Sequence, residues 1–193
     1  MKIIYLVGIP GSGKSSFAKE LAKKEKAVIL SSDAIRQELY GDETKQKSRI
    51  IYRVLYERLN NCIVNGQSVI VDATNIERER RMFSLGKAKN AETICYYFDT
   101  PFEVCVERNE KRKRTVEYRI LEKMRKNLEF PMLGEGFDEI HIVHESQSYA
   151  IQKEKFLQLV ESECTYEELF EGLKCIPLFN DIISFNQENL HHQ

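Results

Sequence analysis

The sequence predicts a doubly wound α/β fold, with a mainly parallel five-stranded sheet and helices on both of its faces. Two observations predict this class. Five short apolar segments alternate along the chain with longer segments whose apolar residues recur at helical spacing. The short segments are apolar at nearly every position, which is typical of parallel strands buried on both faces. With 193 residues, of which 42% are hydrophobic, the chain is long enough to bury one sizeable core.

The expected elements follow one another from the first residues onward. We expect strands at residues 3–7, 27–33, 68–75, 93–99 and 139–143. After the first strand and its loop, a helix is expected where apolar residues recur at helical spacing, at Phe17, Ala18, Leu21 and Ala22. Further helices are expected at residues 34–40, 48–64 and 101–113, the last with Pro101 in its first turn. Ligands of such sheets bind beyond the carboxyl ends of the strands, so the residues that follow each strand are candidates for a site.

The segment GIPGSGKS, from Gly8 to Ser15, lies between the first strand and the first helix. It fits the pattern G-x-x-x-x-G-K-[ST], whose glycines let the backbone turn successive N–H groups toward a polyphosphate. The positive N-terminal end of the next helix adds to this attraction. Lys14 is expected to reach the β- and γ-phosphates of a nucleotide, and the Ser15 hydroxyl to bind Mg²⁺. The predicted nucleotide-binding residues of this loop are Gly8, Gly11, Ser12, Gly13, Lys14, Ser15 and Ser16. The alternative interpretation is an ordinary glycine-rich turn between a strand and a helix.

Asp33 and Arg36 stand three residues apart in the segment SSDAIRQEL, so both can face the same side of a first helical turn. A carboxylate beside a phosphate site can accept a proton from an attacking hydroxyl, and an arginine can hold a second anionic group in bidentate fashion. The pair therefore indicates an acceptor that carries its own phosphate. The alternative is structural, because Ser32 or Asp33 would also serve as the N-cap of the helix.

Asp72 ends the third apolar strand, in the segment VIVDATN, where P-loop proteins often place an acidic residue near Mg²⁺. We therefore predict that Ser15 and Asp72 bind the metal. Ala73 follows Asp72, so the Asp-Glu pair of hydrolytic motor ATPases is missing and a mechanical ATPase is disfavoured. Thr74 and Asn75 are expected either to orient loops or the acceptor, or to form an Asx-type turn.

Residues 107–126 form a segment, here called the lid, in which basic residues outnumber acidic ones. Such a run is commonly a solvated helix face with Glu–Arg and Glu–Lys pairs. This run follows the fourth strand, where it could close over the phosphates, and arginines from a closing segment neutralise charge during phosphoryl transfer. Arg108 and Arg112 are four residues apart, so we expect them on one helical face, in contact with the nucleotide. Arg112 is also predicted to be catalytic, and Arg114 is a further candidate.

The composition indicates which partners and which cellular location to expect for the protein. A net charge of −1 gives no overall attraction to nucleic acid, so any such contact must be local. The five cysteines lack CxxC spacing and mostly sit in apolar patterns, which predicts reduced core residues of a cytosolic protein. Neither a signal peptide nor a membrane span is predicted, so we expect a cytoplasmic protein without a membrane partner.

Six segments over residues 1–143 resemble, in their order, the polynucleotide 5′-kinase family of P-loop phosphotransferases: GIPGSGKSSFAKE, SSDAIRQEL, VIVDATN, FDTPFEVCVERNEKRKR, RILEKMRKNLEFP and GEGFDEIHIV. The resemblance implies that the chain binds ATP with Mg²⁺ and transfers the γ-phosphoryl group to the 5′-OH of DNA or RNA. It also implies catalytic roles beside Lys14: Asp33 as general base, Arg36 as ligand of the acceptor's adjacent phosphate, and Arg112 as the lid arginine on the donor phosphates. The triplet SSD departs from the Asn-Arg-Asp type of phage and animal relatives, and a broader set of small kinases shares SSDAIR.

Two other functions fit the same motifs. The chain could phosphorylate a small molecule or a nucleoside, which labelling of oligonucleotides or of free metabolites would distinguish. It could also be a nucleotide-dependent switch without an acceptor, a function against which the Asp33–Arg36 pair argues.

The end of the chain changes in composition. We expect a P-loop kinase domain at residues 1–150 and an acidic helical appendage at residues 151–193. The last segment, FNQENLHHQ, resembles the entry to an HD-type metal-dependent phosphohydrolase domain, and a frayed tail is the alternative. Two adjacent histidines cannot build a metal site without further ligands, so no metal is expected at His191 or His192.

Overall fold

The central strand of the sheet sends its side chains alternately into two separate hydrophobic cores. In the computed structural model, which describes residues 1–41, 48–88, 90–112 and 114–144, this strand is β1 (Lys2–Val7). Ile3, Tyr5 and Val7 belong to one buried cluster, and Ile4 and Leu6 belong to another on the opposite face. A strand buried on both faces needs a layer of helices on each side.

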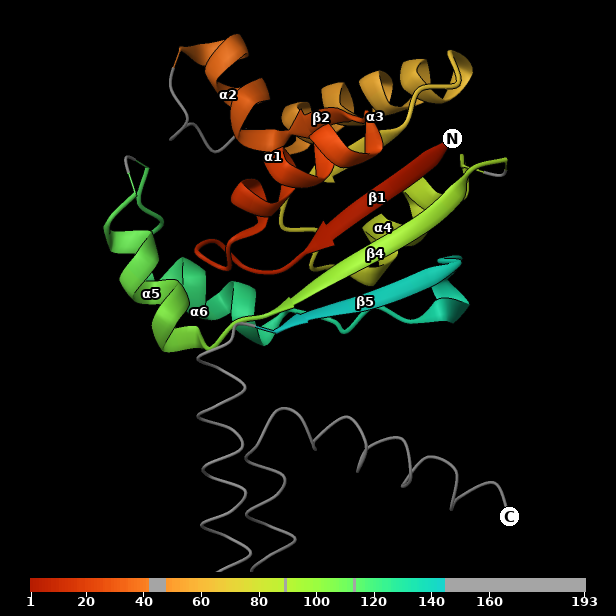
Figure 1. Cartoon of the computed structure of the whole chain (residues 1–193). Helices are drawn as coiled ribbons and strands as arrows, with labels where there is room; N and C mark the ends of the chain where they lie inside the picture. Colours follow the sequence, from red (N-terminus) through yellow and green to blue (C-terminus); the bar gives the residue numbers. More distant parts are fainter. Residues whose placement is uncertain (42–47, 89, 113, 145–193) are drawn as a thin grey trace, which may run out of the picture. The chain divides into compact units, whose positions relative to one another are not determined.

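Five strands form one sheet in the order β2-β3-β1-β4-β5 (Figure 1). The pairs β1–β3, β1–β4 and β2–β3 are parallel, so their carboxyl ends meet at one edge. This result confirms the predicted five-stranded α/β class. The bounds of the other strands are β2 (Val28–Ser31), β3 (Val69–Asp72), β4 (Glu92–Asp99) and β5 (Glu139–His144).

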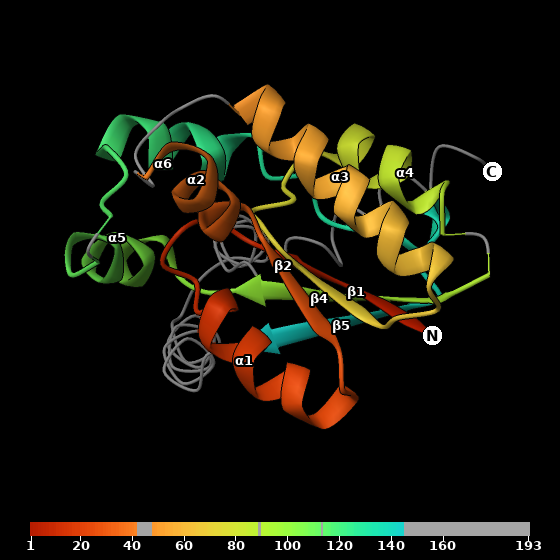
Figure 2. The same ribbon diagram turned by 90° about the horizontal axis from the view of Figure 1, so that it is seen from above.

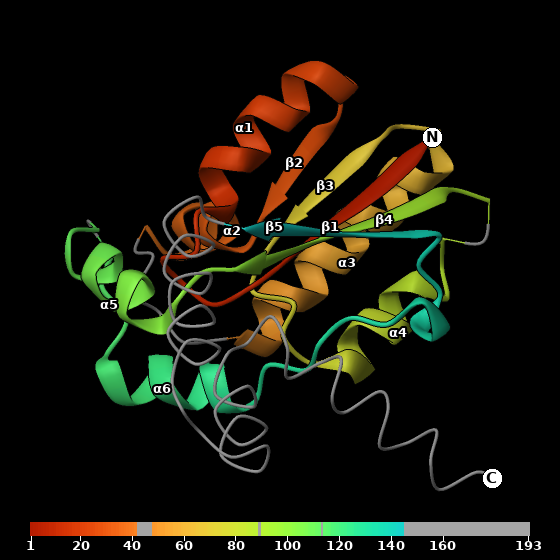
Figure 3. The ribbon, with the colours of Figure 1, turned by 60° about the horizontal axis from the view of Figure 1, so that its bottom comes forward.

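Helices cover both faces of the sheet, as Figure 3 shows. On one face, α1 (Lys14–Glu25) packs Ala18 and Leu21 against the cluster that contains Ile4. The opposite face is covered by α3 (Ser48–Val64) and α4 (Arg78–Leu85), whose buried apolar residues join the cluster that contains Tyr5. The sheet is therefore doubly wound.

Two short helices lie beyond the carboxyl ends of the strands, the first leading into the lid and the second within it (Figure 2). They are α5 (Phe102–Glu110) and α6 (Tyr118–Lys126). A third apolar cluster holds both helices against the loop after β1 and the segment after β3, and it consists of Ile9, Ile76, Phe102, Cys105 and Leu121. This cluster fixes the base of the lid beside the loop that follows β1.

Several predicted boundaries need correction. The second strand ends at Ser31, and α2 (Ser32–Tyr40) begins there with the Ser31 side chain as its N-cap, accepting a hydrogen bond from the Ala34 N–H. The alternative interpretation, in which Ser32 or Asp33 caps this helix, is therefore wrong. Pro101 is the N-cap of α5 rather than a first-turn residue. Because α5 ends at Glu110, Arg112 follows the helix and does not share a helical face with Arg108.

The sequence did not predict α4 or the 3-10 helix at Leu133–Glu135. Cys62, Cys95 and Cys105 are buried thiols that form no disulfide within the described residues, whereas Cys164 and Cys175 lie outside them. The predicted appendage, its boundary near residue 150 and the two terminal histidines also lie outside the described residues. None of the described helices has the length and apolar character needed to cross a membrane.

Candidate active site

The loop between β1 and α1 has a backbone that depends on glycine. Gly11 has a φ of 88°, and a Cβ atom there would lie 2.2 Å from the carbonyl oxygen of Cys105 in α5. Gly13, with a φ of 94°, turns the chain into the first residue of α1. The Gly8 N–H donates to the Thr74 carbonyl at 3.0 Å, which ties the start of the loop to the segment after β3. Close packing thus requires glycine at Gly11, which the motif leaves open, and backbone conformation favours it at Gly13, which the motif specifies.

Lys14 is buried at the N-terminus of α1, and its ammonium group lies within the loop. Its Nζ atom donates to the Ile9 carbonyl at 2.7 Å and to Ser12 Oγ at 3.1 Å. Burial lowers the pKa of Lys14 to about 8, and the carboxylate of Asp72 partly opposes this shift. An anion placed in the loop would stabilise the charged form of Lys14.

Asp72 and Ser15 bring two oxygen ligands together at the edge where β3 ends and α1 begins. Asp72 is 7% exposed, and its burial raises the pKa of the carboxyl group. The hydrogen bond from Ser15 and the charge of Lys14 lower that pKa and so favour the carboxylate. A carboxylate and a hydroxyl oxygen side by side are ligands that suit Mg²⁺.

Asp33, in the first turn of α2, is surrounded by three arginines. Its Oδ1 atom accepts hydrogen bonds from Arg36 at 2.6 Å and from Arg114 at 2.5 Å, and its Oδ2 atom accepts one from Arg112 at 3.2 Å. Two of these arginines come from the lid and one from α2. The lid is therefore anchored over the loop by the carboxylate of Asp33.

Arg36 has a buried polar atom with no partner. The residue is 9% exposed, and its Nε atom has no hydrogen-bond partner among the described residues. Burial and the neighbouring charge of Arg114 lower its pKa. A buried donor without an acceptor is costly, so the geometry suits an anionic ligand that would accept from Nε.

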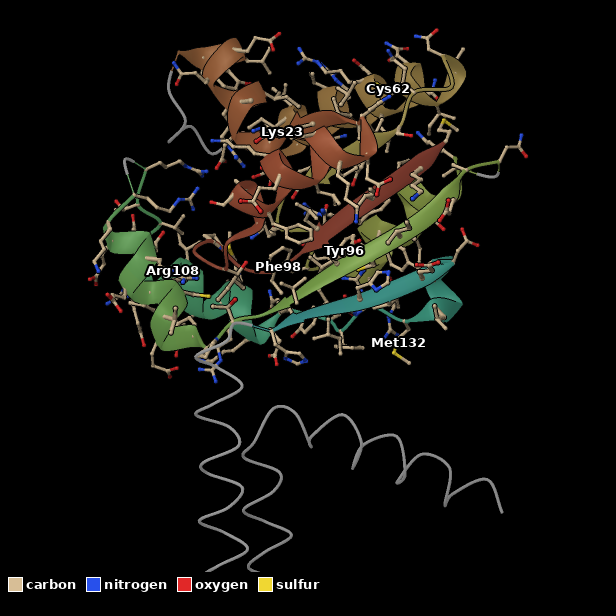
Figure 4. All side chains as sticks on the ribbon, viewed as in Figure 1. Lys23, Cys62, Tyr96, Phe98, Arg108 and Met132 are labelled. Atoms are coloured by element: carbon tan, nitrogen blue, oxygen red, sulfur yellow. The ribbon has the colours of Figure 1, made fainter. Side chains whose placement is uncertain are left out.

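These groups line one cavity of about 490 Å³ between the loop, the lid, α2, α3 and the segment after β3. Figure 4 labels Arg108, whose side chain extends from α5. The structure brings most of the predicted site residues into the lining: Gly11, Gly13, Lys14, Ser15, Ser16, Asp33, Arg36, Asp72, Arg108 and Arg112. Gly8 and Ser12 do not line it; Ser12 is buried behind the loop as a partner of Lys14.

The cavity also contains residues that sequence reasoning missed or interpreted only in part. Tyr52 of α3 and Arg80 of α4 line it, and the guanidinium of Arg80 lies 5.0 Å from the centre of the Tyr52 ring. Arg114, a further candidate from the sequence, lies in the lining as well. No local pattern marks Tyr52 or Arg80, because only the packing of α3 against α4 brings them together.

Asn75 holds the segment after β3 in place. It adopts a φ of 47°, and its Nδ2 atom donates to the carbonyls of Leu6 at 2.8 Å and Val71 at 3.2 Å. Asn75 therefore links the ends of β1 and β3. Its own carbonyl accepts from Arg81 Nη1 at 2.9 Å, so the buried Arg81 supports this segment from below. These contacts fix the loop next to Asp72.

The fold and the loop define a P-loop protein of the kinase type, with a nucleotide-binding loop at the carboxyl edge of a parallel sheet. A family model described as an AAA domain matches residues 3–131. Because this match covers more than half of the sequence, the chain belongs to that AAA domain family.

Known proteins with similar sequences or structures include several kinases. The L-seryl-tRNA(Sec) kinase of Methanococcus maripaludis is 28% identical over 142 residues, which are 67% of this chain and 53% of that protein. The chain thus spans about half the length of this relative. A chain of the Pnkp1/Rnl/Hen1 RNA repair complex has a TM-score of 0.59 at 27% identity, over 66% of this chain and 43% of that one. Kti12 of Chaetomium thermophilum, solved with ADP-AlF3, shares the fold with a TM-score of 0.62 at 18% identity, over 84% of this chain and 100% of that one.

Proposed function

We propose that the chain transfers the γ-phosphoryl group of ATP to a hydroxyl, and that the acceptor is the 5′-OH end of DNA or RNA. The observation that carries this proposal is the position of Asp33. Its carboxylate lies in the cavity that Lys14 and Asp72 also line, and it does not cap its helix. A switch without an acceptor has no use for a carboxylate at this place, whereas a phosphotransferase needs a group that accepts the hydroxyl proton.

The donor half of the cavity fits the phosphates of ATP. The N–H groups of residues 11–16 and the ammonium group of Lys14 would bind the β- and γ-phosphates, with Arg108 and Arg112 supplying charge from the lid. Ser15 and Asp72 would hold Mg²⁺, because their oxygen atoms are adjacent and face the cavity. When bound, the metal neutralises negative charge on the phosphates.

The reaction would follow from these positions. Asp33 accepts the proton of the acceptor hydroxyl while the hydroxyl oxygen bonds to the γ-phosphorus. The bond from that phosphorus to the bridging oxygen breaks, and ADP leaves with the electron pair. Lys14 and Arg112 stabilise the negative charge on the transferred group and on the leaving oxygen. Arg36, whose Nε atom has no acceptor within the described residues, would bind the phosphate next to the acceptor hydroxyl.

Two observations support a polynucleotide as the acceptor. The motif order resembles that of the polynucleotide 5′-kinases, and the names of two similar proteins, L-seryl-tRNA(Sec) kinase and a member of an RNA repair complex, refer to RNA. A small-molecule or nucleoside acceptor is the second candidate, because a cavity of about 490 Å³ is of the size that holds small ligands.

Labelling with γ-labelled ATP tests the proposal. We expect transfer to a 5′-OH oligonucleotide and to a nucleoside 3′-phosphate, with weaker transfer to the nucleoside that lacks the phosphate. Arg36→Ala should reduce the rate with the nucleoside 3′-phosphate more than the rate with the nucleoside. Label that appears only in free metabolites would establish the second candidate instead, and nucleotide binding without transfer to any acceptor would leave only the switch.

A further inference from the structure

A continuous series of aromatic and basic side chains crosses from α3 to α4. Arg80 lies over the ring of Tyr52 at 5.0 Å, and the Tyr52 and Tyr56 ring centres are 5.9 Å apart. The ring centre of Tyr56 is 5.7 Å from that of Phe83, and the Nζ atom of Lys87 lies 4.7 Å from the Phe83 ring centre. We call these five residues the aromatic track.

The spacing of these residues puts them on facing sides of the two helices. Tyr52 and Tyr56 are four residues apart in α3, so they occupy one face of that helix. Arg80 and Phe83 are three residues apart in α4, and Lys87 follows the helix four residues after Phe83. Figures 2 and 3 show α3 and α4 side by side on the same face of the sheet.

The track is continuous with the cavity at one end. Tyr52 and Arg80 line the cavity, whereas Tyr56, Phe83 and Lys87 do not. The series of contacts therefore begins beside the proposed acceptor position and leads away from it over the surface of α3 and α4.

The outer end of the track is open to solvent. Phe83 is 59% exposed, and both Arg80 and Lys87 are exposed cations. Tyr56 is half-buried, and its ring lies between those of Tyr52 and Phe83. Glu77 is the acidic neighbour, and its carboxylate accepts from Arg80 Nε at 2.7 Å. Phe83 therefore contacts Tyr56 and still keeps more than half of its surface available to a ligand.

We propose that the aromatic track binds the nucleotides that follow the 5′ end of a single-stranded acceptor. This inference rests on the proposed function, because the track starts at the acceptor side of the cavity. Proteins that bind single strands without sequence preference combine rings on which bases stack with cations that contact the backbone. Tyr56 and Phe83 would supply stacking surfaces, and Arg80 and Lys87 would attract phosphates. Because the net charge of the chain is only −1, attraction to nucleic acid has to come from local cations such as these two.

The test measures binding directly and does not require turnover. A 3′-labelled single-stranded oligonucleotide of about ten bases with a 5′-OH is titrated with the full chain, and its fluorescence anisotropy gives the Kd. Phe83→Ala should weaken binding by at least about fivefold, the lower end of the contribution of one stacked base. Lys87→Ala should reduce the slope of log K against log salt by about 0.7, because one phosphate contact is lost.

Matched controls separate this effect from general changes. Met82→Ala removes another exposed apolar side chain of α4. Lys23→Ala removes an exposed lysine, labelled in Figure 4, of α1, which packs on the opposite face of the sheet. Both controls should bind within about twofold of the original chain, a change that lies within the error of such estimates. A blunt duplex of the same sequence offers no unstacked bases, so Phe83→Ala should not affect its binding.

The outcomes are distinct. The proposal that the aromatic track binds the acceptor strand is refuted if the original chain binds no single-stranded oligonucleotide, or if Phe83→Ala binds it as tightly as Met82→Ala does. It is also refuted if Phe83→Ala weakens binding of the duplex as much as binding of the single strand. Labelling by γ-labelled ATP is scored separately with the same oligonucleotide. Phe83-dependent binding without labelling refutes the proposed 5′-kinase function and keeps the track as a nucleic-acid surface, whereas labelling without any dependence on Phe83 refutes the track alone.

Discussion

The Nη1 atom of Arg114 lies 2.5 Å from the Oδ1 atom of Asp33, so an arginine of the lid is paired with the carboxylate that we propose as the base. Arg36 and Arg112 share the same carboxylate. Three guanidinium groups thus surround one negative charge, and the cluster retains positive charge that phosphate oxygens can use. Phosphates of a bound nucleotide would compete with Asp33 for the two lid arginines and leave the carboxylate available to a hydroxyl proton.

Replacing Asp33 by asparagine separates catalysis from binding. Asp33→Asn should lower the rate of transfer by about 10²–10⁴-fold, the range for a positioned base. ATP should bind at least as tightly as before, because Arg112 and Arg114 lose a charged competitor. Initial rates and isothermal titration with ATP measure the two quantities. Glu38→Gln, which changes an exposed carboxylate of the same helix, is the control, and an Asp33→Asn variant with undiminished turnover would exclude Asp33 as the base.

The lowered pKa of Lys14 makes ATP binding depend on pH. In the free protein this pKa is about 8, so the ammonium group loses its proton as the pH rises through 8. Phosphates stabilise the charged form of Lys14, so ATP binding takes up a proton above pH 8. The affinity for ATP should therefore fall by up to about tenfold for each pH unit above 8. Titrations of ATP between about pH 7 and pH 9.5 measure this slope.

Two variants of Lys14 complete this prediction. Lys14→Arg should bind with little dependence on pH over the same range, because a guanidinium group keeps its proton. Lys14→Ala should abolish turnover, because the charge that develops between the β- and γ-phosphates loses its fixed cation. An affinity of the original chain that stays constant from pH 7 to pH 9.5, or normal transfer by Lys14→Ala, would contradict the role of Lys14.

Local patterns made part of this architecture predictable. Lys14 and Ser15 follow from a loop motif whose spacing alone fixes their positions, and Asp72 follows from the end of an apolar strand. The helix α4 was missed for a physical reason: its buried side chains are Arg81, Ser84 and Leu85, so it lacks the apolar periodicity by which helices are recognised.

Contacts across the fold were not predictable in the same way. Arg114 and Asp33 are 81 residues apart, and nothing near either residue indicates the other. The prediction that Arg108 and Arg112 share a helical face is wrong because α5 ends between them. Tyr52 meets Arg80 only because both helices cover the same face of the sheet. Such pairs depend on tertiary packing rather than on spacing along the chain.

The close approach of Gly11 to α5 predicts a steric effect. In Gly11→Ala the new Cβ would lie 2.2 Å from the Cys105 carbonyl oxygen, and the φ of 88° would be strained for alanine. The strained backbone alone should lower stability by roughly 1–3 kcal/mol, and the displaced loop should bind ATP more weakly. Thermal unfolding and ATP titration measure both effects. Gly134→Ala, at an exposed glycine with nothing within 4 Å of its Cβ position, should change neither, and equal melting temperatures for the two variants would refute the prediction.

The buried pair of Arg81 and Glu135 supports the site from beneath. Arg81 donates to Glu135 through Nε at 2.7 Å and through Nη2 at 2.8 Å, and both side chains are almost fully buried. Arg81→Ala leaves the Glu135 carboxylate buried without its main partner and removes the donor to the Asn75 carbonyl. Loss of one partner of a buried pair should lower the free energy of unfolding by about 3–5 kcal/mol, which urea titration measures.

The exposed pair Arg53–Glu57 of α3 provides the matched control for Arg81→Ala. Arg53→Ala should cost no more than about 1 kcal/mol, because water already solvates both charges. Replacing both buried partners, as Arg81→Met with Glu135→Leu, should cost less than the sum of the single changes, since no buried charge is left unpaired. A cost for Arg81→Ala as small as that for Arg53→Ala would show that the pair does not hold the segment after β3, and the position of Asn75 beside Asp72 would then need another explanation.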